Sequence, residues 1–233
     1  MKVKAGDPPP PRRTQAERTA ATRTLLIDSA RKLFAGKGFS AVSTEAIVAA
    51  AGVTRGALYH QFDDKAALFA AVYEQVEQEL VADVGQRIVA ASPADQLQAM
   101  RVGARLFLDL VSAPDVQQIV LIDAPAVLGW EQWRAVGMKY GLGIIEAMLA
   151  QAMADEAIPD QPLHATAHVL LAVLDEAALY VARAADDRHA RDEMVLVCDR
   201  VIAGIAGRGD EPLARRADNP ALPAGLTPTR RRP

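Results

Sequence analysis

The chain has 233 residues, of which 51% are hydrophobic and only 5% aromatic, and its formal net charge is −3. This length can bury a substantial core as one or two domains, and a composition dominated by Ala, Leu and Val favours helices. No continuous apolar run reaches the roughly 18–20 residues of a membrane span, the first residues lack a secretory signal, and a single cysteine excludes an internal disulfide. We therefore expect a cytoplasmic protein.

Charge is unevenly distributed along the chain. Residues 1–65 carry 11 Lys and Arg against 6 Asp and Glu, whereas the remaining residues carry 15 against 23. A basic first quarter on an acidic body favours a polyanionic partner for that first quarter. Nucleic acid is the partner that this imbalance favours, although a basic tail alone would produce the same numbers.

The chain begins with a Pro-rich, basic segment, residues 1–14, that we expect to be disordered. Apolar residues then recur on one face of a helix over about 15–35. Gly36 and Gly38 end this helix.

Two short helices are predicted next. Ser43 is a good N-cap for a helix that reaches Ala51. Gly52 ends that helix, and Thr54 caps a third one through Gln61.

A long fourth helix follows, capped by Asp63 or Asp64. Its apolar stripe has steps of four residues: Leu68, Val72, Val76, Leu80, Val84 and Ile88. Further helices are predicted over about 93–112, 114–122, 130–154, 162–185 and 188–206, before a Pro- and Arg-rich segment, 208–233, that we expect to be disordered. No segment alternates with the period of a strand, so the predicted fold class is all-α.

Two short helices joined at Gly52 are the arrangement of a helix-turn-helix. Glycine can adopt the left-handed backbone conformation that such a tight turn needs. The third helix would then present its outer face to a DNA major groove. The alternative is an ordinary corner between two helices, with Tyr59 and Phe62 in the core. In the helix-turn-helix, the face that packs the two short helices together would consist of Ile47, Ala51, Val53 and Leu58.

Arg55, in the first turn of the third helix, is the candidate base reader, because a guanidinium pairs bidentately with a guanine edge. Gly56 beside it has no side chain and allows close approach to the bases. Phosphates favour helix N-termini. The other candidate DNA contacts at these ends and on the third helix are Ser43, Thr44, Thr54, Ala57, Tyr59, His60 and Lys65.

The sequence GF…VSTEAIVAAAGVTRGALYHQFDDKAALF, within about residues 18–70, resembles the N-terminal signature of the tetracycline-repressor (TetR) family of bacterial transcriptional regulators. Two positions depart from the family pattern. Val48 stands where the family usually has alanine, and Gln61 stands where it usually has a histidine that touches phosphate. Gln61 can still donate a hydrogen bond to phosphate, without charge.

The resemblance implies a homodimer that binds a palindromic double-stranded DNA operator as a transcriptional repressor. Residues 15–64 would form the DNA-binding domain, and residues 65–207 the effector-binding and dimerisation domain. It also implies that a small-molecule effector relieves repression by moving the fourth helix and spreading the two DNA-binding domains.

The last two long helices carry small and apolar residues on wide faces. Two such hairpins, paired across a two-fold axis, would form a four-helix bundle. The alternative is that these faces pack only within the subunit. The candidate dimer interface consists of Leu170, Leu171, Leu174, Ala178, Val181, Cys198, Val201 and Ile202.

Asp123 lies in the apolar stretch IVLIDAPAVLGW, where a buried carboxylate must be paired or hydrogen-bonded. It is either a polar anchor in an effector pocket or, as we favour, a helix cap or a structural partner of Arg101 or Arg105. Pro125 should prevent the helix from simply continuing. The candidate effector-pocket residues are Arg105, Asp109, Asp123, Trp130, Trp133, Tyr140 and Glu146.

His164, His168 and Asp175 share one helix face at a spacing that metal ligands use. Two histidines four residues apart are also frequent by chance, and Leu171 lies on the same face, so we expect no metal. Cys198 is expected to be a small buried hydrophobe rather than a redox sensor.

Two other functions are possible on the sequence alone. One is a DNA-binding regulator that has no small-molecule effector. The other is an all-α enzyme, but the sequence offers no nucleophile–base constellation and no phosphate-binding glycine loop. We therefore expect no catalytic residues and no cofactor.

Overall fold

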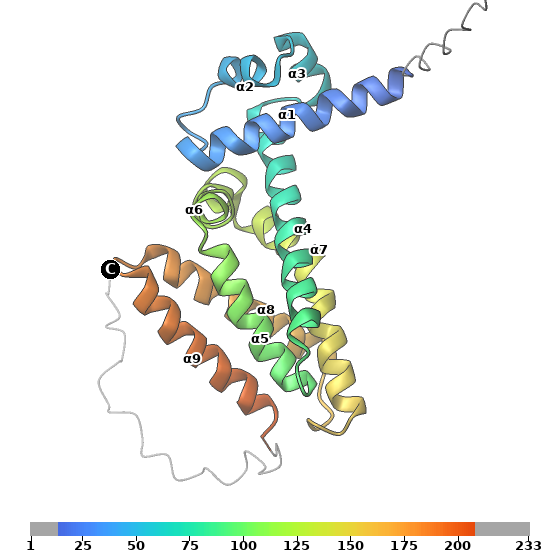
Figure 1. Ribbon diagram of the computed structural model, residues 1–233, viewed down its shortest axis with the longest axis vertical. Coiled ribbons are helices and arrows are strands. Elements are labelled where there is room, and N and C mark those ends of the chain that lie inside the picture. The colour runs from blue at the N-terminus through green and yellow to red at the C-terminus, as the bar shows by residue number, and fades with distance from the viewer. Residues whose placement is uncertain (1–13, 208–233) are drawn as a thin grey trace, which may run out of the picture.

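Residues 14–207 of the computed structural model consist of helices and their connections, which confirms the predicted all-α class (Figure 1). Residues 1–13 and 208–233, where we expected disorder, lie outside the described residues. Thr14 is described, and it forms a reciprocal capping box with Glu17 at the start of α1.

The first three helices, α1 (Gln15–Lys37), α2 (Thr44–Ala51) and α3 (Arg55–Gln61), form a unit that we call the reading head. Ser43 and Thr54 cap α2 and α3 as predicted, each accepting from a backbone N–H at 3.2 Å. Gly52 has the predicted left-handed conformation, with φ 65° and ψ 30°. The core of the reading head consists of Leu26, Ala30, Phe34, Ile47 and Leu58, all completely buried.

Helix α4 (Lys65–Ala91) leaves the reading head and runs down the length of the molecule (Figure 1). Asp64 caps it by accepting from the N–H of Ala67 at 2.7 Å. The predicted stripe from Leu68 to Ile88 is buried throughout. Because one face of α4 stays apolar over its whole length, a single helix connects the reading head to the helices below it.

The remaining helices surround the lower part of α4. They are α5 (Gln96–Val111), α6 (Pro114–Gln117), the π-helical turn η1 (Gln118–Asp123), α7 (Ala124–Ala154), α8 (Leu163–Arg183) and α9 (Asp187–Ile205). Helix α8 packs on both α7 and α9, and α5 packs on α4 and α9. The predicted bounds of these helices agree within a few residues except at α7.

Helix α7 starts earlier than predicted, because Pro125 does not interrupt the helix. Pro125 lies in the first turn of α7, where a missing N–H costs no intrahelical hydrogen bond. The interruption falls instead at Gly129, whose φ of 78° and ψ of 165° are not helical. The predicted start at Trp130 therefore marks a kink inside α7.

One helix of the described part, α8, is long and apolar enough to cross a membrane by length and mean composition, although Asp175 and Glu176 interrupt its apolar run. Its Ala167, Ala177 and Leu179 are buried inside the chain, as they are in the core helix of a globular protein. Only 39% of its most apolar window is buried, however. An apolar part of α8 therefore faces outward.

Candidate DNA interface and ligand cavity

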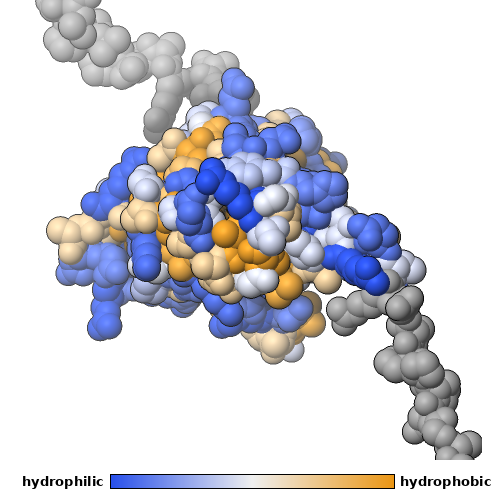
Figure 2. Space-filling model, turned by 90° about the horizontal axis from the view of Figure 1, so that it is seen from above, coloured by the Kyte–Doolittle hydropathy of each residue, from blue (hydrophilic) through white to orange (hydrophobic). Residues whose placement is uncertain are grey.

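The outer face of α3 is exposed and lies at the end of the molecule. Arg55, Gly56, Tyr59 and His60 are exposed, whereas Leu58 and Phe62 are buried against the reading-head core. Seen from this end, the surface is mostly hydrophilic, with apolar side chains near its middle (Figure 2). The structure therefore leaves the predicted contacts of α3 accessible, and it places Phe62 in the core.

Arg55 is held by an ion pair that sequence reasoning missed. Its Nη1 lies 2.9 Å from Oε1 of Glu45, and its guanidinium lies 5.5 Å from the centre of the Tyr59 ring. Tyr59 and Glu45 both raise the pKa of Arg55. The available signal was that Glu45 and Arg55 occupy the first turns of two adjoining helices. To contact a base edge, the Arg55 guanidinium must first leave the carboxylate of Glu45.

Lys65 begins α4, at a helix N-terminus as predicted, but its side chain has partners inside the chain. Its Nζ donates to the carbonyl oxygens of Phe39 at 3.0 Å and Val42 at 2.9 Å, and it lies 4.0 Å from the centre of the Phe39 ring. These contacts fix the connection between α1 and α2. Because its ammonium is engaged, we no longer assign the side chain to a phosphate, and only the backbone at the start of α4 keeps that possibility.

Gln61 lies at the end of α3, where its backbone oxygen accepts from Nη1 of Arg23 at 3.3 Å. The Arg23 guanidinium also lies 4.4 Å from the centre of the Phe62 ring. Arg23 is exposed and cationic at the edge of the reading head, and no motif in the sequence pointed to it.

Below the reading head, α4, α5, α7, α8 and α9 enclose a cavity with about 820 Å³ of empty space, counting its opening to solvent. We call it the central cavity. Its apolar lining includes Val81, Val84 and Ile88 of α4, Met100 and Phe107 of α5, Ile144 and Met148 of α7, Leu170, Leu171 and Leu174 of α8, and Cys198, Val201 and Ile202 of α9.

Two carboxyl groups, Glu77 and Asp175, lie among these apolar residues. Asp175 forms an ion pair with Arg134. Glu77 is only 7% exposed, the single buried charged residue among those described, and its carboxyl has no hydrogen bond or ion pair with residues 14–207. Burial raises the pKa of Glu77 to about 7.

The polar contacts around Glu77 belong to its neighbours. Tyr73, one turn earlier on α4, donates its hydroxyl to the backbone oxygen of Trp133 at 3.0 Å. Trp133 in turn donates Nε1 to the oxygen of Val120 in η1 at 2.9 Å. Burial and then Glu77 raise the pKa of Tyr73, which therefore stays a neutral donor.

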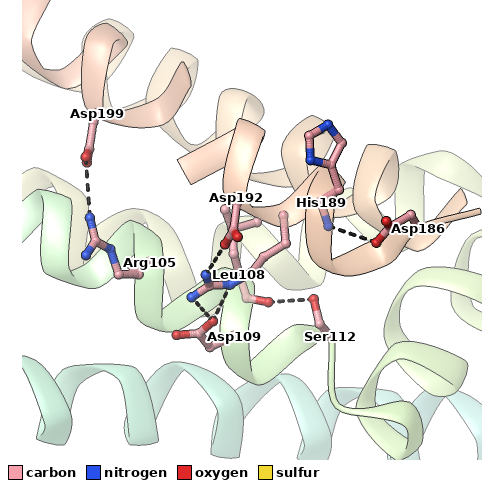
Figure 3. Close-up of polar contacts among 9 residues, drawn as sticks. Arg105, Leu108, Asp109, Ser112, Asp186, His189, Asp192 and Asp199 are labelled. Carbon is pink, nitrogen blue, oxygen red and sulfur yellow. Dashed lines mark hydrogen bonds and ion pairs between the residues drawn. The ribbon is translucent and has the colours of Figure 1, made fainter. Parts of the chain in front are cut away.

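Arg105 and Asp109, predicted for the effector pocket, lie instead on the outer side of α5 in ion pairs with α9 (Figure 3). Arg105 Nη2 lies 3.5 Å from Asp199, and Arg191 Nε lies 2.6 Å from Asp109. These contacts hold α5 against α9.

The other predicted pocket residues also lie outside the central cavity. Trp130 is 59% exposed, Tyr140 donates to Glu74 at 2.9 Å, and Glu146 contacts His164 at 2.6 Å. Asp123 accepts from the N–H of Phe39, a structural role of the kind that we favoured, although neither Arg101 nor Arg105 is its partner. Trp133 is buried and borders a smaller cavity beside Tyr73 and Glu77.

The predicted dimer interface needs a larger correction. Leu170, Leu171, Leu174, Cys198, Val201 and Ile202 all line the central cavity, and Ala178 and Val181 are 1% exposed within the single chain. Six of the eight side chains are buried inside the single chain, so packing within the subunit accounts for them, whereas Leu174 and Val201 are only half-buried.

The residues at metal-ligand spacing have other partners. His164 contacts Glu146, and Asp175 pairs with Arg134. Between residues 14 and 207 there is no group of three His, Cys, Asp or Glu residues that would hold a metal ion. Cys198 is 1% exposed, and burial raises the pKa of its thiol, as expected for a small core residue.

Comparisons with known proteins agree with this architecture. A family model described as "Bacterial regulatory proteins, tetR family" matches residues 26–72, and one described as "Tetracyclin repressor-like, C-terminal domain" matches residues 97–205. A solved TetR-family transcriptional regulator from Pectobacterium atrosepticum is 30% identical, covers 83% of this chain and 97% of its own, and has a TM-score of 0.74. The structure of RolR with resorcinol is 20% identical, covers 83% and 97% of the two chains, has a TM-score of 0.64, and shows the fold alone.

Curated relatives match part of the chain. The transposon Tn10 TetC protein of Escherichia coli is 28% identical over 59% of this chain and 68% of its own length. The regulator AcrR of Shigella flexneri is 38% identical over 39% of this chain and 41% of its own length. The activities of these whole proteins therefore do not transfer directly.

Proposed function

Since the chain belongs to the TetR family of DNA-binding transcriptional regulators, which are not enzymes, we propose that it is a ligand-released repressor. It binds a palindromic operator as a homodimer, and a small molecule in the central cavity releases it. Relatives that are described as transcriptional repressors in Mycobacterium tuberculosis and Brucella suis support repression rather than activation. A regulator of this kind acts where the DNA is, in the cytoplasm.

The proposed DNA contacts are the exposed groups of the reading head. Arg55 reads a base edge after it leaves Glu45, and the N-termini of α2 and α3 receive phosphates. Thr54 and Ser43 keep their hydroxyl oxygens on the helix caps, so their role at the DNA is to hold those N-termini in place.

The observation that carries the proposal is the position of α4. Its first residue, Lys65, holds the connection before α2, while Glu77, Val81, Val84 and Ile88 line the central cavity further along the same helix. A ligand that displaces α4 in the cavity therefore moves the start of α4 and the reading head with it. The resorcinol complex of RolR supports the idea that this fold holds small molecules.

The proposed dimer face is the outward side of α8 and α9. Val169, Tyr180, Leu196 and Val197 are large apolar residues that are 59, 46, 59 and 43% exposed in the single chain. Most of the apolar window of α8 is also unburied. A second copy that packs α8 and α9 against their equivalents would cover these side chains. We divide the chain accordingly into a DNA-binding domain, 15–64, and an effector-binding and dimerisation domain, 65–207.

A mobility-shift assay tests the function. The purified protein should bind DNA from beside its own gene at low salt, and it should bind random DNA of equal length more weakly. If it binds neither at low salt, the proposed operator function is wrong. A regulator without an effector would bind the operator, but no small molecule that stabilises the protein would release it.

A further inference from the structure

The central cavity has an unusual balance of charge. Its lining contains two carboxyl groups, Glu77 and Asp175, and no Lys, Arg or His. An anionic ligand would find no cation on the wall of this cavity and would face two carboxyl groups. A ligand with a positive charge would instead be attracted by these carboxyl groups.

The two carboxyl groups are not equivalent. Asp175 is already paired with Arg134 from α7, so its charge is compensated before any ligand enters. Glu77 is only 7% exposed, no hydrogen bond or ion pair joins its carboxyl to residues 14–207, and its oxygens reach the cavity, since the one fully enclosed side-chain oxygen without a partner in this part of the chain is Asp199 Oδ1. A carboxyl that is largely withdrawn from water gains free energy when a ligand supplies it with a donor.

We propose that the effector is an apolar organic amine whose ammonium group binds the carboxylate of Glu77. This inference rests on the proposed function, in which the central cavity is the effector site. The hydrophobic body of the amine would lie against the apolar side chains of α5, α7 and α8, among them Phe107, Ile144 and Leu171. Such a ligand combines a large buried apolar area with one oriented polar contact.

The wall beside Glu77 leaves room for this contact. Gly137 of α7 faces the carboxyl, and a Cβ at that position would lie 3.9 Å from Oε1 of Glu77. A glycine thus replaces the side chain that would otherwise cover this oxygen. Gly137 borders the smaller cavity, which shares Glu77, Phe107 and Asp175 with the central cavity, so the carboxyl is uncovered on that side.

The ionisation of Glu77 supports the same chemistry. Burial raises its pKa to about 7, so an incoming ammonium would draw the carboxyl to its charged form. The other ionisable groups facing it are Tyr73 of α4, Asp175 of α8 with its partner Arg134 of α7, and Cys198 of α9; the lining from α5 is apolar. Burial keeps Tyr73 and Cys198 neutral. Glu77 is therefore the group whose charge changes near neutral pH.

The experiment uses three probes with one skeleton: 4-phenylbutylamine, 4-phenylbutanol and 4-phenylbutyrate. Titration calorimetry on the full chain at pH 8 should give the amine the highest affinity and the carboxylate the lowest. In Glu77→Gln the amine should lose about tenfold in affinity, while the alcohol changes by less than about threefold. Glu79→Gln on the outer side of α4, where Glu79 pairs with Arg31, is the matched control and should leave all three affinities unchanged.

A second measurement needs no variant. Amine binding to the wild-type chain should weaken as pH falls from 8 to 6, because Glu77 becomes protonated, and alcohol binding should stay nearly constant. The inference is overturned if the carboxylate binds as tightly as the amine, or if Glu77→Gln leaves amine affinity unchanged. If the alcohol binds and releases operator DNA but the amine has no advantage, the proposed function stands and only the choice of an amine is wrong. If no probe binds, the cavity fails as an effector site and both proposals about it fall.

Discussion

The carboxylate of Asp123 accepts a hydrogen bond from the backbone N–H of Phe39 at 2.7 Å, and this contact joins the end of η1 to the connection between α1 and α2. Gly38 lies beside it with φ 74°, and a Cβ there would come within 3.2 Å of Gln118 Nε2. In the same η1 turn, the backbone oxygen of Val120 accepts a hydrogen bond from the indole N–H of Trp133. A hydrogen-bonded route therefore runs from the neighbourhood of Glu77 to the reading head.

Removing this acceptor should loosen the reading head from the helices below it. We expect Asp123→Ala to lower the free energy of unfolding by about 1–3 kcal/mol, because the Phe39 N–H loses a charged acceptor at a partly buried place. Asp123→Asn keeps a side-chain oxygen and should recover part of the loss. Urea denaturation measures both.

Asp115 provides the control for this prediction, since it lies on the neighbouring α6 and its side chain is exposed. Asp115→Ala should change the free energy of unfolding by less than about 0.5 kcal/mol. Equal losses for Asp115→Ala and Asp123→Ala would mean that the hydrogen bond to Phe39 contributes nothing specific.

Lys65 should matter for stability rather than for phosphate binding. Lys65→Met keeps most of the aliphatic stem but leaves the carbonyl oxygens of Phe39 and Val42 without their donor. We expect a lower melting temperature and a salt dependence of DNA affinity that is nearly unchanged. The exposed Lys37 is the control, since Lys37→Met should leave the melting temperature where it was. An unchanged melting temperature with a salt slope flatter by about one unit would return Lys65 to the phosphate contacts.

Arg55 should read sequence. Arg55→Ala is expected to cost about 1–3 kcal/mol of operator affinity and to relax the preference at one base pair in each half-site. Competition binding against operators changed at single positions measures this. Arg87→Ala is the matched control, because Arg87 also forms an exposed pair, with Asp83, but on α4 away from the reading head. If Arg55→Ala weakens specific and random DNA equally, Arg55 contacts only the backbone.

The dimer face can be tested with one charged substitution. Leu196→Glu places a carboxylate on the exposed apolar side of α9 and should give a monomer at micromolar concentration, whereas the wild-type chain sediments as a dimer. Val89, in the last turn of α4 and not on α8 or α9, is 78% exposed, so Val89→Glu should remain dimeric. A dimeric Leu196→Glu protein, or a monomeric wild-type chain, would contradict the proposed face.

The reading head was predictable because short-range chemistry determines it. Ser43, Gly52 and Thr54 each act through their own backbone or hydroxyl on residues a few positions away. Their effect can be read without knowledge of the rest of the fold. The contacts of Lys65 with Phe39 and Val42 cross 23 residues or more, and no local sequence pattern indicates a partner for its ammonium.

The cavity was not predictable for a related reason. Helix α8 has apolar residues around most of its circumference, so Leu170 on its inner side and Val169 on its outer side cannot be told apart by periodicity. Glu77 follows Val76 of the α4 stripe, and from the sequence alone it would be taken for a solvent-exposed residue. In the structure it is buried beside α7 and α8. Which face lines the cavity and which stays exposed depends on helices that lie far away in the sequence.

Glu77 should also make stability depend on pH. Its pKa is about 7 in the folded chain and 4.5 at its ordinary value, so between these values the folded state binds more protons than the unfolded state. Stability from this group therefore falls as pH rises from about 4.5 to 7, by about 3 kcal/mol in total. Glu77→Gln cannot titrate and should lose this dependence.

The measurement is the difference in unfolding free energy between Glu77→Gln and the wild-type chain, taken at pH 5 and at pH 8. From pH 5 to pH 8 this difference should shift by about 2–3 kcal/mol in favour of Glu77→Gln, because only the wild type must bury a carboxylate at the higher pH. Glu79→Gln serves as the reference for a carboxyl group at the surface of the same helix. A difference that stays constant with pH would mean that Glu77 is ionised, and therefore paired, in the folded chain.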